Sequence, residues 1–225
     1  MAGILFIISA PSGSGKSTLV AEVRRLVPGL EFSVSYTTRA PRGSEEDGRE
    51  YHFTTKENFE RMIAADEFLE YATVFGDNYY GTAISALQQA REHGHDLLLD
   101  IDVQGALQVM KKVPEAVSIF ILPPSPQVLE MRLRTRSQAE GVTQEDVIER
   151  RLSQARNELL KIGDYKYALV NDQLDLAASE MRAIVLSERG ESGKTAAIAA
   201  RCLTVAHSAR LDAALASFQV TPAAR

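Results

Sequence analysis

The stretch from Ser9 to Thr18 is SAPSGSGKST, in which glycine, serine and threonine make up seven of the ten residues. It follows the apolar run ILFII and precedes a segment with helical spacing. Glycines allow a turn in which several backbone N–H groups point inward, and the next helix adds unpaired amides and its positive dipole end. Small residues are required because a phosphate must touch the backbone itself. The stretch therefore predicts a loop that binds the phosphates of a nucleoside triphosphate.

Two side chains of this loop have predicted roles of their own. Lys16 is expected to reach the β- and γ-phosphates and to act in catalysis, and the Ser17 hydroxyl is expected to bind Mg²⁺. The common pattern has glycine at position 10, where this chain has Ala10, a small residue that still fits if its φ is negative. The predicted ATP-binding residues of the loop are Ala10, Pro11, Ser12, Gly13, Ser14, Gly15, Lys16, Ser17 and Thr18.

A second SGKT occurs at residues 192–195. The preceding MRAIVLSERGE is typical of a helix end rather than a strand, and Glu188 occupies the first-glycine position, where a carboxylate would repel phosphate. We expect this copy to belong to a linker.

Asp100 ends the apolar run in LLLDID. A carboxylate at the end of a buried strand is where a magnesium ligand belongs in a phosphate-loop fold, although such a residue can also simply end a strand or cap a helix. With the phosphate loop present, Ser17 and Asp100 are the predicted Mg²⁺ ligands.

A phosphate loop alone fits a GTPase, a motor or a small-molecule kinase, so the acceptor side must decide. The segment SYTTRAPRGSEEDGREYHF brings Arg39 and Arg42 together with Tyr51, and FLEYATVFGDNYYGT adds Glu70, Tyr79, Tyr80 and Thr82. Two arginines three positions apart, near tyrosine hydroxyls, can hold one phosphate monoester through charge-assisted hydrogen bonds.

The stretch MRLRTRSQAEGVTQEDVIERRL is rich in arginine. Arg132 and Arg136 share a helical face, and Arg151 follows on the next helix, which begins with a near-match to a capping box at Thr143 and Asp146. A basic helical hairpin suits a lid that closes over phosphates and excludes water. Arg134 and Arg150 are expected to be ordinary solvated charges.

Short apolar runs alternate with amphipathic stretches along the chain. Strands are expected at 4–9, 32–36, 96–101, 117–122 and 167–171, and three of these are unbroken apolar runs, which is typical of strands covered on both faces. This pattern predicts an α/β fold with a parallel sheet. Helices are expected at 16–27, 55–65, 83–93, 103–111, 125–136, 143–162 and 174–187.

Composition limits the classes of function. The chain has 225 residues, suits one domain, and carries a net charge of −5, which argues against a nonspecific nucleic-acid binder. It shows neither a membrane span nor a signal peptide, so we expect a cytoplasmic protein without a membrane partner. The single Cys202 cannot form an internal disulfide, and the four histidines show no metal-ligand spacing.

After Ser187 the chain becomes polar and then Ala-rich with helical spacing. We expect residues 190–225 to form a linker and a helical extension that either packs on the domain or forms contacts in a homo-oligomer.

The motifs together give the chain a clear resemblance. Over roughly residues 4–189 it resembles bacterial guanylate kinases, which belong to the phosphate-loop nucleoside monophosphate kinases. The resemblance is carried by SAPSGSGKST, SVSYTTRAPRGSEEDGREYHF, FLEYATVFGDNYYGT, LDIDVQGA, IFILPPS, RLRTRS and YALVND, in that order. It implies a core over 1–34 and 83–189 with a five-stranded parallel sheet, a GMP-binding insertion over about 35–82, and a helical lid over about 126–160.

The resemblance also implies site roles. It assigns Arg39, Arg42, Tyr51 and Tyr80 to the GMP phosphate, Ser35, Glu70 and Thr82 to the guanine, and Asp100 and Asp102 to the junction with the transfer site. Catalysis falls to Lys16, Arg39, Arg136 and Arg151. Family members often have glycine where Ser137 stands, which leaves the hinge geometry there open. Asn171 lies near the adenine in the family, but a cap of the helix at Leu174 is an equal alternative.

The expected reaction is transfer of the ATP γ-phosphate to GMP or dGMP, with Mg²⁺. Guanine presents N1–H and a 2-amino group as donors beside the O6 acceptor, so a carboxylate such as Glu70 accepts both, and the Thr82 or Ser35 hydroxyl donates to O6. Two alternatives remain: a noncatalytic guanylate-kinase-like interaction module, or a phosphate-loop kinase for another nucleoside monophosphate or a sugar phosphate.

Overall fold

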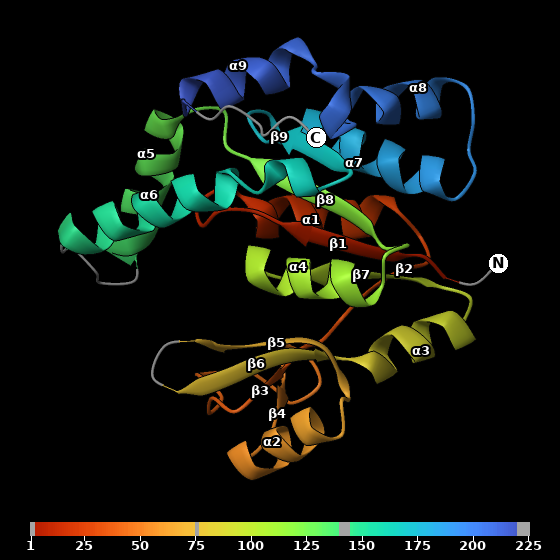
Figure 1. Ribbon diagram of the computed structural model, residues 1–225, viewed down its shortest axis with the longest axis vertical. Helices are drawn as coiled ribbons and strands as arrows, with labels where there is room; N and C mark the ends of the chain where they lie inside the picture. The colour runs from red at the N-terminus through yellow and green to blue at the C-terminus, as the bar shows by residue number, and fades with distance from the viewer. Residues whose placement is uncertain (1–2, 75–76, 140–144, 220–225) are drawn as a thin grey trace. The chain divides into compact units, whose positions relative to one another are not determined.

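The computed structural model describes residues 3–74, 77–139 and 145–219. The chain divides into two compact units, of which unit 1 comprises Met1–Ile7 and Gly29–Ala116, and unit 2 comprises Ile8–Pro28 and Val117–Arg225. Figure 1 traces both units. The predicted division into a core, a GMP-binding insertion over 35–82 and a lid over 126–160 stays a prediction.

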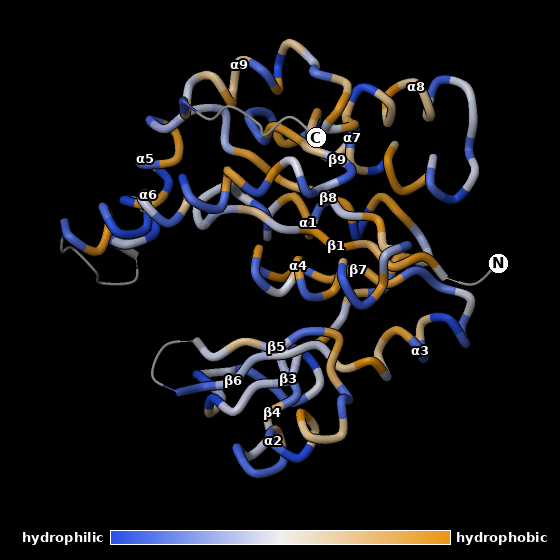
Figure 2. The backbone as a smooth tube through the Cα atoms, in the orientation of Figure 1, coloured by the Kyte–Doolittle hydropathy of each residue, from blue (hydrophilic) through white to orange (hydrophobic). Residues whose placement is uncertain are grey.

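The central element is a five-stranded sheet with the strand order β2-β7-β1-β8-β9. Every residue of β1 and β8 is buried, and the colours of Figure 2 show both strands as apolar. Strands covered on both faces carry apolar residues at successive positions instead of alternating apolar and polar ones. Since β2 pairs in parallel with β7 and β8 with β9, the predicted parallel sheet in an α/β fold is confirmed. The strands are β1 (Leu5–Ser9), β2 (Leu30–Phe32), β7 (Asp96–Asp100), β8 (Val117–Leu122) and β9 (Tyr167–Val170).

The strand expected at 32–36 is wrong. Its place is taken by β2, whose residues Leu30–Phe32 pair in parallel with Asp96–Leu98 of β7. The Ser33 amide still donates to the Leu98 carbonyl at 3.1 Å, after which the chain leaves this sheet. Residues 33–36 are only partly buried, so the apolar letters in FSVSY did not mark a strand covered on both faces.

Unit 1 holds a second sheet with the order β4-β3-β6-β5, in which β6 is antiparallel to both of its neighbours. A small core of Phe59, Met62, Phe68 and Ala83 supports it, and the Phe59 and Phe68 rings stack 4.3 Å apart. These apolar contacts hold the hairpin of β5 and β6 in place. The elements are β3 (Tyr36–Thr37), β4 (His52–Phe53), α2 (Lys56–Ala64), β5 (Phe68–Val74), β6 (Asn78–Ala83), α3 (Ile84–Glu92) and α4 (Val103–Lys112).

The helices expected to begin at residues 16, 125 and 174 begin within one residue of these positions. The predicted helix start at Thr143, with its capping box, lies outside the described residues, and α6 is described from Glu145. The helices are α1 (Lys16–Leu26), α5 (Pro126–Ala139), α6 (Glu145–Leu159), α7 (Leu174–Glu188), α8 (Lys194–Arg201) and α9 (Ala209–Ser217), with short 3₁₀ turns at Ile162–Asp164 and Thr204–Ala206.

The C-terminal extension packs on unit 2. Helix α8 contacts α7, α9 contacts β9, and the Ala168 amide donates to the Cys202 carbonyl at 2.8 Å. Burial raises the pKa of the Cys202 thiol to about 12, which leaves it an unreactive apolar residue. Contacts in an oligomer stay a prediction.

The second SGKT lies only partly in a linker, because its last two residues, Lys194 and Thr195, already belong to α8. The Thr195 hydroxyl donates to the Glu191 carboxylate at 3.2 Å, so an acidic group lies at this helix start. Within the described residues, no helix is long and apolar enough to cross a membrane.

Candidate active site

The loop between β1 and α1 has the backbone of a phosphate cradle. Gly13 and Gly15 have φ of +86° and +81°, a region that L side chains rarely adopt, and the Ser14 amide donates to the Pro11 carbonyl at 3.1 Å. Gly15 is the N-cap of α1 and supplies no side-chain cap. The N-cap residue therefore offers no side-chain acceptor to the first-turn amides of α1, an arrangement that suits an anion.

Both glycines are also required by close packing. A Cβ on Gly15 would lie 2.6 Å from the Asn171 amide nitrogen, and one on Gly13 would lie 3.0 Å from Leu129 and Leu133. The first distance is well inside van der Waals contact. The loop is therefore pressed against α5 and the end of β9.

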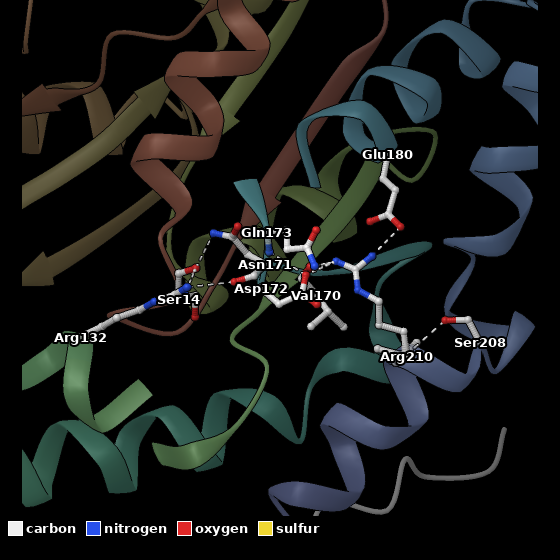
Figure 3. Close-up of polar contacts among 10 residues, drawn as sticks. Ser14, Arg132, Val170, Asn171, Asp172, Gln173, Glu180, Ser208 and Arg210 are labelled. Carbon is white, nitrogen blue, oxygen red and sulfur yellow. Dashed lines mark hydrogen bonds and ion pairs between the residues drawn. The ribbon is translucent and has the colours of Figure 1, made fainter. Parts of the chain in front are cut away.

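Asn171 fastens this loop to the sheet (Figure 3). Its side-chain amide donates to the Ser14 carbonyl at 2.9 Å, and its backbone amide donates to the Leu122 carbonyl at 2.8 Å. The residue is 5% exposed. The alternative that Asn171 caps α7 is wrong, because the N-cap is Gln173, which makes no side-chain cap bond.

Arg132 on α5 holds the same carbonyl. Its guanidinium donates to the Ser14 carbonyl at 3.3 Å and to the Asn171 carbonyl at 3.1 Å (Figure 3). Sequence reasoning placed Arg132 on the lid face with Arg136 but gave it no contact. The i, i+4 spacing was the available signal, yet only the fold shows that Arg132 reaches the loop.

Among the other arginines of this helical pair, Arg134 makes an ion pair that joins the two helices. Arg134 is not an ordinary solvated charge: it pairs with Glu130 at 2.8 Å and donates to both oxygens of Glu145 at 2.5 and 2.8 Å, which ties α5 to α6. These two carboxylates hold the pKa of Arg134 above its usual value. Arg136 and Arg150 are exposed.

Arg151 on α6 donates to the Ser137 hydroxyl at 3.0 Å, and Ser137 is fully buried. A glycine at position 137 could not accept this bond. Ser137 therefore provides a contact between α5 and α6 that depends on its side chain.

Unit 1 contains a cavity of about 220 Å³ that gathers most of the remaining predicted residues. Residues from both sheets and the β7–α4 loop line it, and they are mostly polar or aromatic. The lining residues are Ser35, Tyr51, Glu70, Ala72, Tyr80, Gly81, Asp100, Ile101 and Asp102.

Glu70 is the buried carboxylate of this cavity. The register of β5 and β6 sets Glu70 opposite Thr82, and the Thr82 hydroxyl donates to it at 2.7 Å. The Ser35 hydroxyl lies 3.5 Å from that of Thr82. Burial, with a smaller contribution from the negative charge of Asp102, raises the pKa of Glu70 to about 7.

Helix α4 approaches this carboxylate closely, a feature that sequence reasoning missed. A Cβ on Gly105 would lie 2.8 Å from Glu70 Oε2, and the Gly105 amide donates to Asp102, the N-cap of α4, at 2.7 Å. The Gln108 side chain accepts from the Tyr71 amide and donates to its carbonyl. These contacts hold the Glu70 strand against α4.

Arg39 sits among aromatic rings. Its guanidinium donates to the Tyr80 hydroxyl at 3.2 Å and lies 5.4 Å from the centre of the Tyr51 ring. It also pairs with Glu45 at 3.0 Å, an ion pair that sequence reasoning did not predict. The Glu45 carboxylate accepts from the Arg42 amide at 2.8 Å, while the Arg42 side chain is exposed. The structure thus brings Arg39, Tyr51 and Tyr80 together but not the Arg42 guanidinium.

Comparisons with known proteins show the family of this chain. The family model described as guanylate kinase matches residues 3–188. The chain is 60% identical over 189 residues to a guanylate kinase of Koribacter versatilis, covering 84% of this chain and 80% of that protein. It is 47% identical to a guanylate kinase of Nitrosospira multiformis, covering 85% and 89% of the two chains. This chain belongs to the guanylate kinase family.

A solved structure supports the fold. The guanylate kinase of Anaplasma phagocytophilum matches with a TM-score of 0.64 at 32% identity, covering 85% of this chain and 88% of that one. The predicted resemblance is therefore confirmed.

Guanylate kinases are kinases that use a divalent metal ion with ATP. In this chain Ser17 lies in the first turn of α1, and Asp100 ends β7 as an exposed carboxylate lining the unit 1 cavity. Hydroxyl and carboxylate oxygens are the donors that a hard divalent cation prefers, so both residues fit such an ion.

Proposed function

We propose that this chain transfers the γ-phosphate of ATP to GMP, and to dGMP, giving ADP and GDP or dGDP. Membership of the guanylate kinase family supports the reaction. The observation that carries the choice of acceptor is the buried carboxylate of Glu70, hydrogen-bonded to Thr82 inside a cavity of about 220 Å³.

The base is selected by the direction of its hydrogen bonds. Ionised Glu70 accepts from guanine N1–H and the 2-amino group, and the Ser35 and Thr82 hydroxyls are close enough together for one of them to donate to O6. Adenine would leave the Glu70 carboxylate facing the N1 acceptor. An unpaired buried charge is costly, which disfavours AMP.

The monophosphate of GMP is assigned to Arg39, Arg42, Tyr51 and Tyr80. Support comes from the cluster of Arg39, Tyr51 and Tyr80, which presents a guanidinium and two phenols. Arg39 already donates to Glu45, and we propose that the GMP phosphate takes over some of these donors. Arg42, whose side chain is exposed, completes the charge around the phosphate.

For the ATP side, we propose that residues 10–18 hold the phosphates, with Lys16 at the β- and γ-phosphates and Asn171 beside the adenine. Ser17 and Asp100 are the proposed ligands of Mg²⁺, which would neutralise phosphate charge when bound. A GMP phosphate oxygen attacks the γ-phosphorus, and the bond to the oxygen of the ADP leaving group breaks. We assign Arg39, Arg136 and Arg151 to stabilising the charge of this transition state, and Asp102 to the junction of the two substrate sites.

No observation favours a noncatalytic interaction module or another acceptor. Homo-oligomer formation stays open to measurement by light scattering. The proposed compartment is the cytoplasm, because nucleotides with several charges do not cross the apolar interior of a membrane.

The test is an acceptor panel. ADP formation from ATP and Mg²⁺ is followed with GMP, dGMP, AMP, UMP and CMP in turn. We expect turnover with GMP and dGMP and at least about 10²-fold less with the others. A preference for AMP, UMP or CMP would refute the assignment of Glu70, and folded protein without any GMP-dependent turnover would favour the interaction module.

A further inference from the structure

Three side chains of types that can bind a metal ion meet in unit 1, and none of them lines the cavity around Glu70. Glu31 lies on β2, His93 is the C-cap of α3, and His95 comes just before β7. Between the histidines, Gly94 has φ of +71°, which reverses the chain direction and lets both rings face the same neighbour. The parallel pairing of Glu31 with Leu97 brings the carboxylate to the same end of these strands.

The ligand atoms of this Glu31–His93–His95 cluster are close together. His95 Nδ1 lies 2.5 Å and His93 Nδ1 3.6 Å from the same carboxylate oxygen of Glu31, and all three ligand atoms lie within 4.8 Å of one another. Atoms bound to one tetrahedral metal ion at about 2.0 Å lie roughly 3.3 Å apart, so small side-chain rotations suffice. The side chains are 38–65% exposed, which leaves room for water ligands.

We propose that this cluster binds one divalent transition-metal ion of the zinc type, with two imidazole nitrogens and one carboxylate oxygen as protein ligands. Imidazole favours Zn²⁺, Co²⁺ or Ni²⁺ over Mg²⁺, so the site differs in chemistry from the ion that accompanies ATP. The sequence concealed it because Glu31 precedes His95 by 64 positions. We expected no metal-ligand spacing among the histidines, whereas the fold brings His93 and His95 to Glu31.

A bound ion would link β2 to the turn between α3 and β7. Because the cluster exists only in the folded chain, an ion that binds it raises the midpoint of thermal unfolding. The residues proposed for phosphoryl transfer are not in the cluster, so turnover measured with saturating Mg²⁺ is expected to stay unchanged.

The test uses the full chain without a histidine tag, stripped with a chelator. Zn²⁺ and Co²⁺ are titrated by calorimetry, and Co²⁺ binding is also followed by its visible absorption. We expect one ion per chain, with affinity lowered at least about tenfold in His93→Ala, His95→Ala and Glu31→Gln.

Matched controls are His52→Ala and His207→Ala, which lie outside the cluster and are expected to bind like the parent chain. Equal Co²⁺ affinity in His95→Ala and the parent would overturn the proposal and leave only a His–Glu ion pair. The absence of stoichiometric binding of either metal would overturn it as well.

A second observation concerns the C-terminal extension, which lies beyond the residues that the family model matches. Arg210 on α9 donates to the Val170 carbonyl, to Asp172 at 2.6 Å and to Glu180 of α7 at 2.7 Å (Figure 3). Val170 and Asp172 flank Asn171, whose amide holds the Ser14 carbonyl of the phosphate loop. One guanidinium thus binds both neighbours of the residue that fastens the loop.

We infer that Arg210 is a positioning residue for the phosphate loop and acts through Asn171. This inference rests on the proposed role of that loop in binding ATP. Without Arg210, the end of β9 loses two contacts, one at the Val170 carbonyl and one at the Asp172 carboxylate, and α7 loses the contact at Glu180. Asn171 then loses its fixed place opposite Ser14.

The test compares Arg210→Met, Arg210→Lys and the control Arg201→Met, an exposed arginine in the last turn of α8. Calorimetry measures ATP and GMP binding separately, and hydrogen exchange follows the amides of residues 12–19. We expect ATP affinity to fall about 3- to 30-fold in Arg210→Met, with faster loop exchange, unchanged GMP affinity and partial recovery in Arg210→Lys.

Equal losses for ATP and GMP would show a merely structural role and overturn the inference, as would unchanged ATP affinity in folded Arg210→Met. Combination with Asn171→Ala should be non-additive if Arg210 acts through Asn171. Because ATP binding is measured without turnover, a parent chain that binds ATP but does not phosphorylate GMP would refute the proposed function alone.

Discussion

The phosphate loop of residues 10–18 takes its binding groups from consecutive backbone amides, whereas the cavity around Glu70 takes its groups from side chains on separate segments. In the loop, two glycines at positive φ shape a cradle that any triphosphate can enter. In the cavity, the buried Glu70 carboxylate accepts a hydrogen bond from the Thr82 hydroxyl, and we propose that this pair discriminates among bases. The difference teaches that backbone amides bind a charge common to all nucleotides, while paired side chains select one base.

The largest expected effect is on the side-chain site. Glu70→Ala removes two charge-assisted hydrogen bonds to guanine, so kcat/KM for GMP should fall about 10²- to 10⁴-fold, while ATP affinity stays within about twofold. Steady-state kinetics with GMP varied, and ATP calorimetry, measure the two quantities. Glu92→Ala, an exposed residue at the end of α3, is the matched control. A comparable loss of ATP affinity in Glu70→Ala would erase the contrast between the two sites.

The backbone site has one decisive side chain. Lys16→Ala should lower kcat about 10²- to 10³-fold, since its charge acts most strongly as the phosphoryl group moves, with little change in KM for GMP. Lys194→Ala is a matched control, because Lys194 occupies the same place in the second SGKT. Single-turnover kinetics separates the chemical step from product release. An equal effect of both substitutions would contradict the assignment of the first copy alone.

The contrast also predicts a pH dependence for one site only. Because the pKa of Glu70 is raised to about 7, its carboxylate is largely protonated at pH 6 and cannot accept two donors from guanine. The KM for GMP should therefore rise as the pH falls from 8 to 6, and the rise should be smaller in Glu70→Gln, where only the GMP phosphate, with a second pKa of about 6, still titrates. Direct titration of GMP binding across this range is the measurement, and identical profiles in both proteins would contradict it.

The same group affects stability with a defined sign. Its folded pKa lies above the unfolded value of 4.5, so its contribution to folding is fully present below pH 4.5 and is lost as the pH rises through about 7. The stability of Glu70→Gln relative to the parent chain, measured by thermal unfolding, should therefore increase between pH 5 and pH 8.

The smallest expected effect tests the packing of the loop. Gly15→Ala adds both positive-φ strain and a Cβ 2.6 Å from the Asn171 amide, and should cost about 1–3 kcal/mol of unfolding free energy. Gly190→Ala has φ of +98° and nothing within 4 Å, so it isolates the backbone part. Denaturant unfolding measures both. Equal costs would show that Asn171 does not press on the loop, and recovery in Gly15→Ala with Asn171→Ala would show that it does.

Features that depend on adjacent residues could be predicted from the sequence, and features that depend on distant segments could not. The phosphate loop could be recognised from ten adjacent letters, because glycine conformations and amide donors are local properties of the chain. The apolar runs of β1 and β8 likewise predicted buried parallel strands. The strand expected at 32–36 was wrong because the actual strand, β2, forms by pairing with Asp96–Leu98 of β7, a partner far along the chain that a local pattern does not show.

From its order of residues alone, this chain showed its α/β class, its phosphate loop and its family, and it predicted Glu70 as the carboxylate that reads the base. The tertiary structure alone decided that Arg132 and Asn171 share the Ser14 carbonyl, that Glu45 pairs with Arg39, and that Gly105 approaches Glu70. The physical reason is range: backbone conformation and burial patterns depend on near neighbours, whereas hydrogen bonds and ion pairs between distant segments exist only once packing has set their distances.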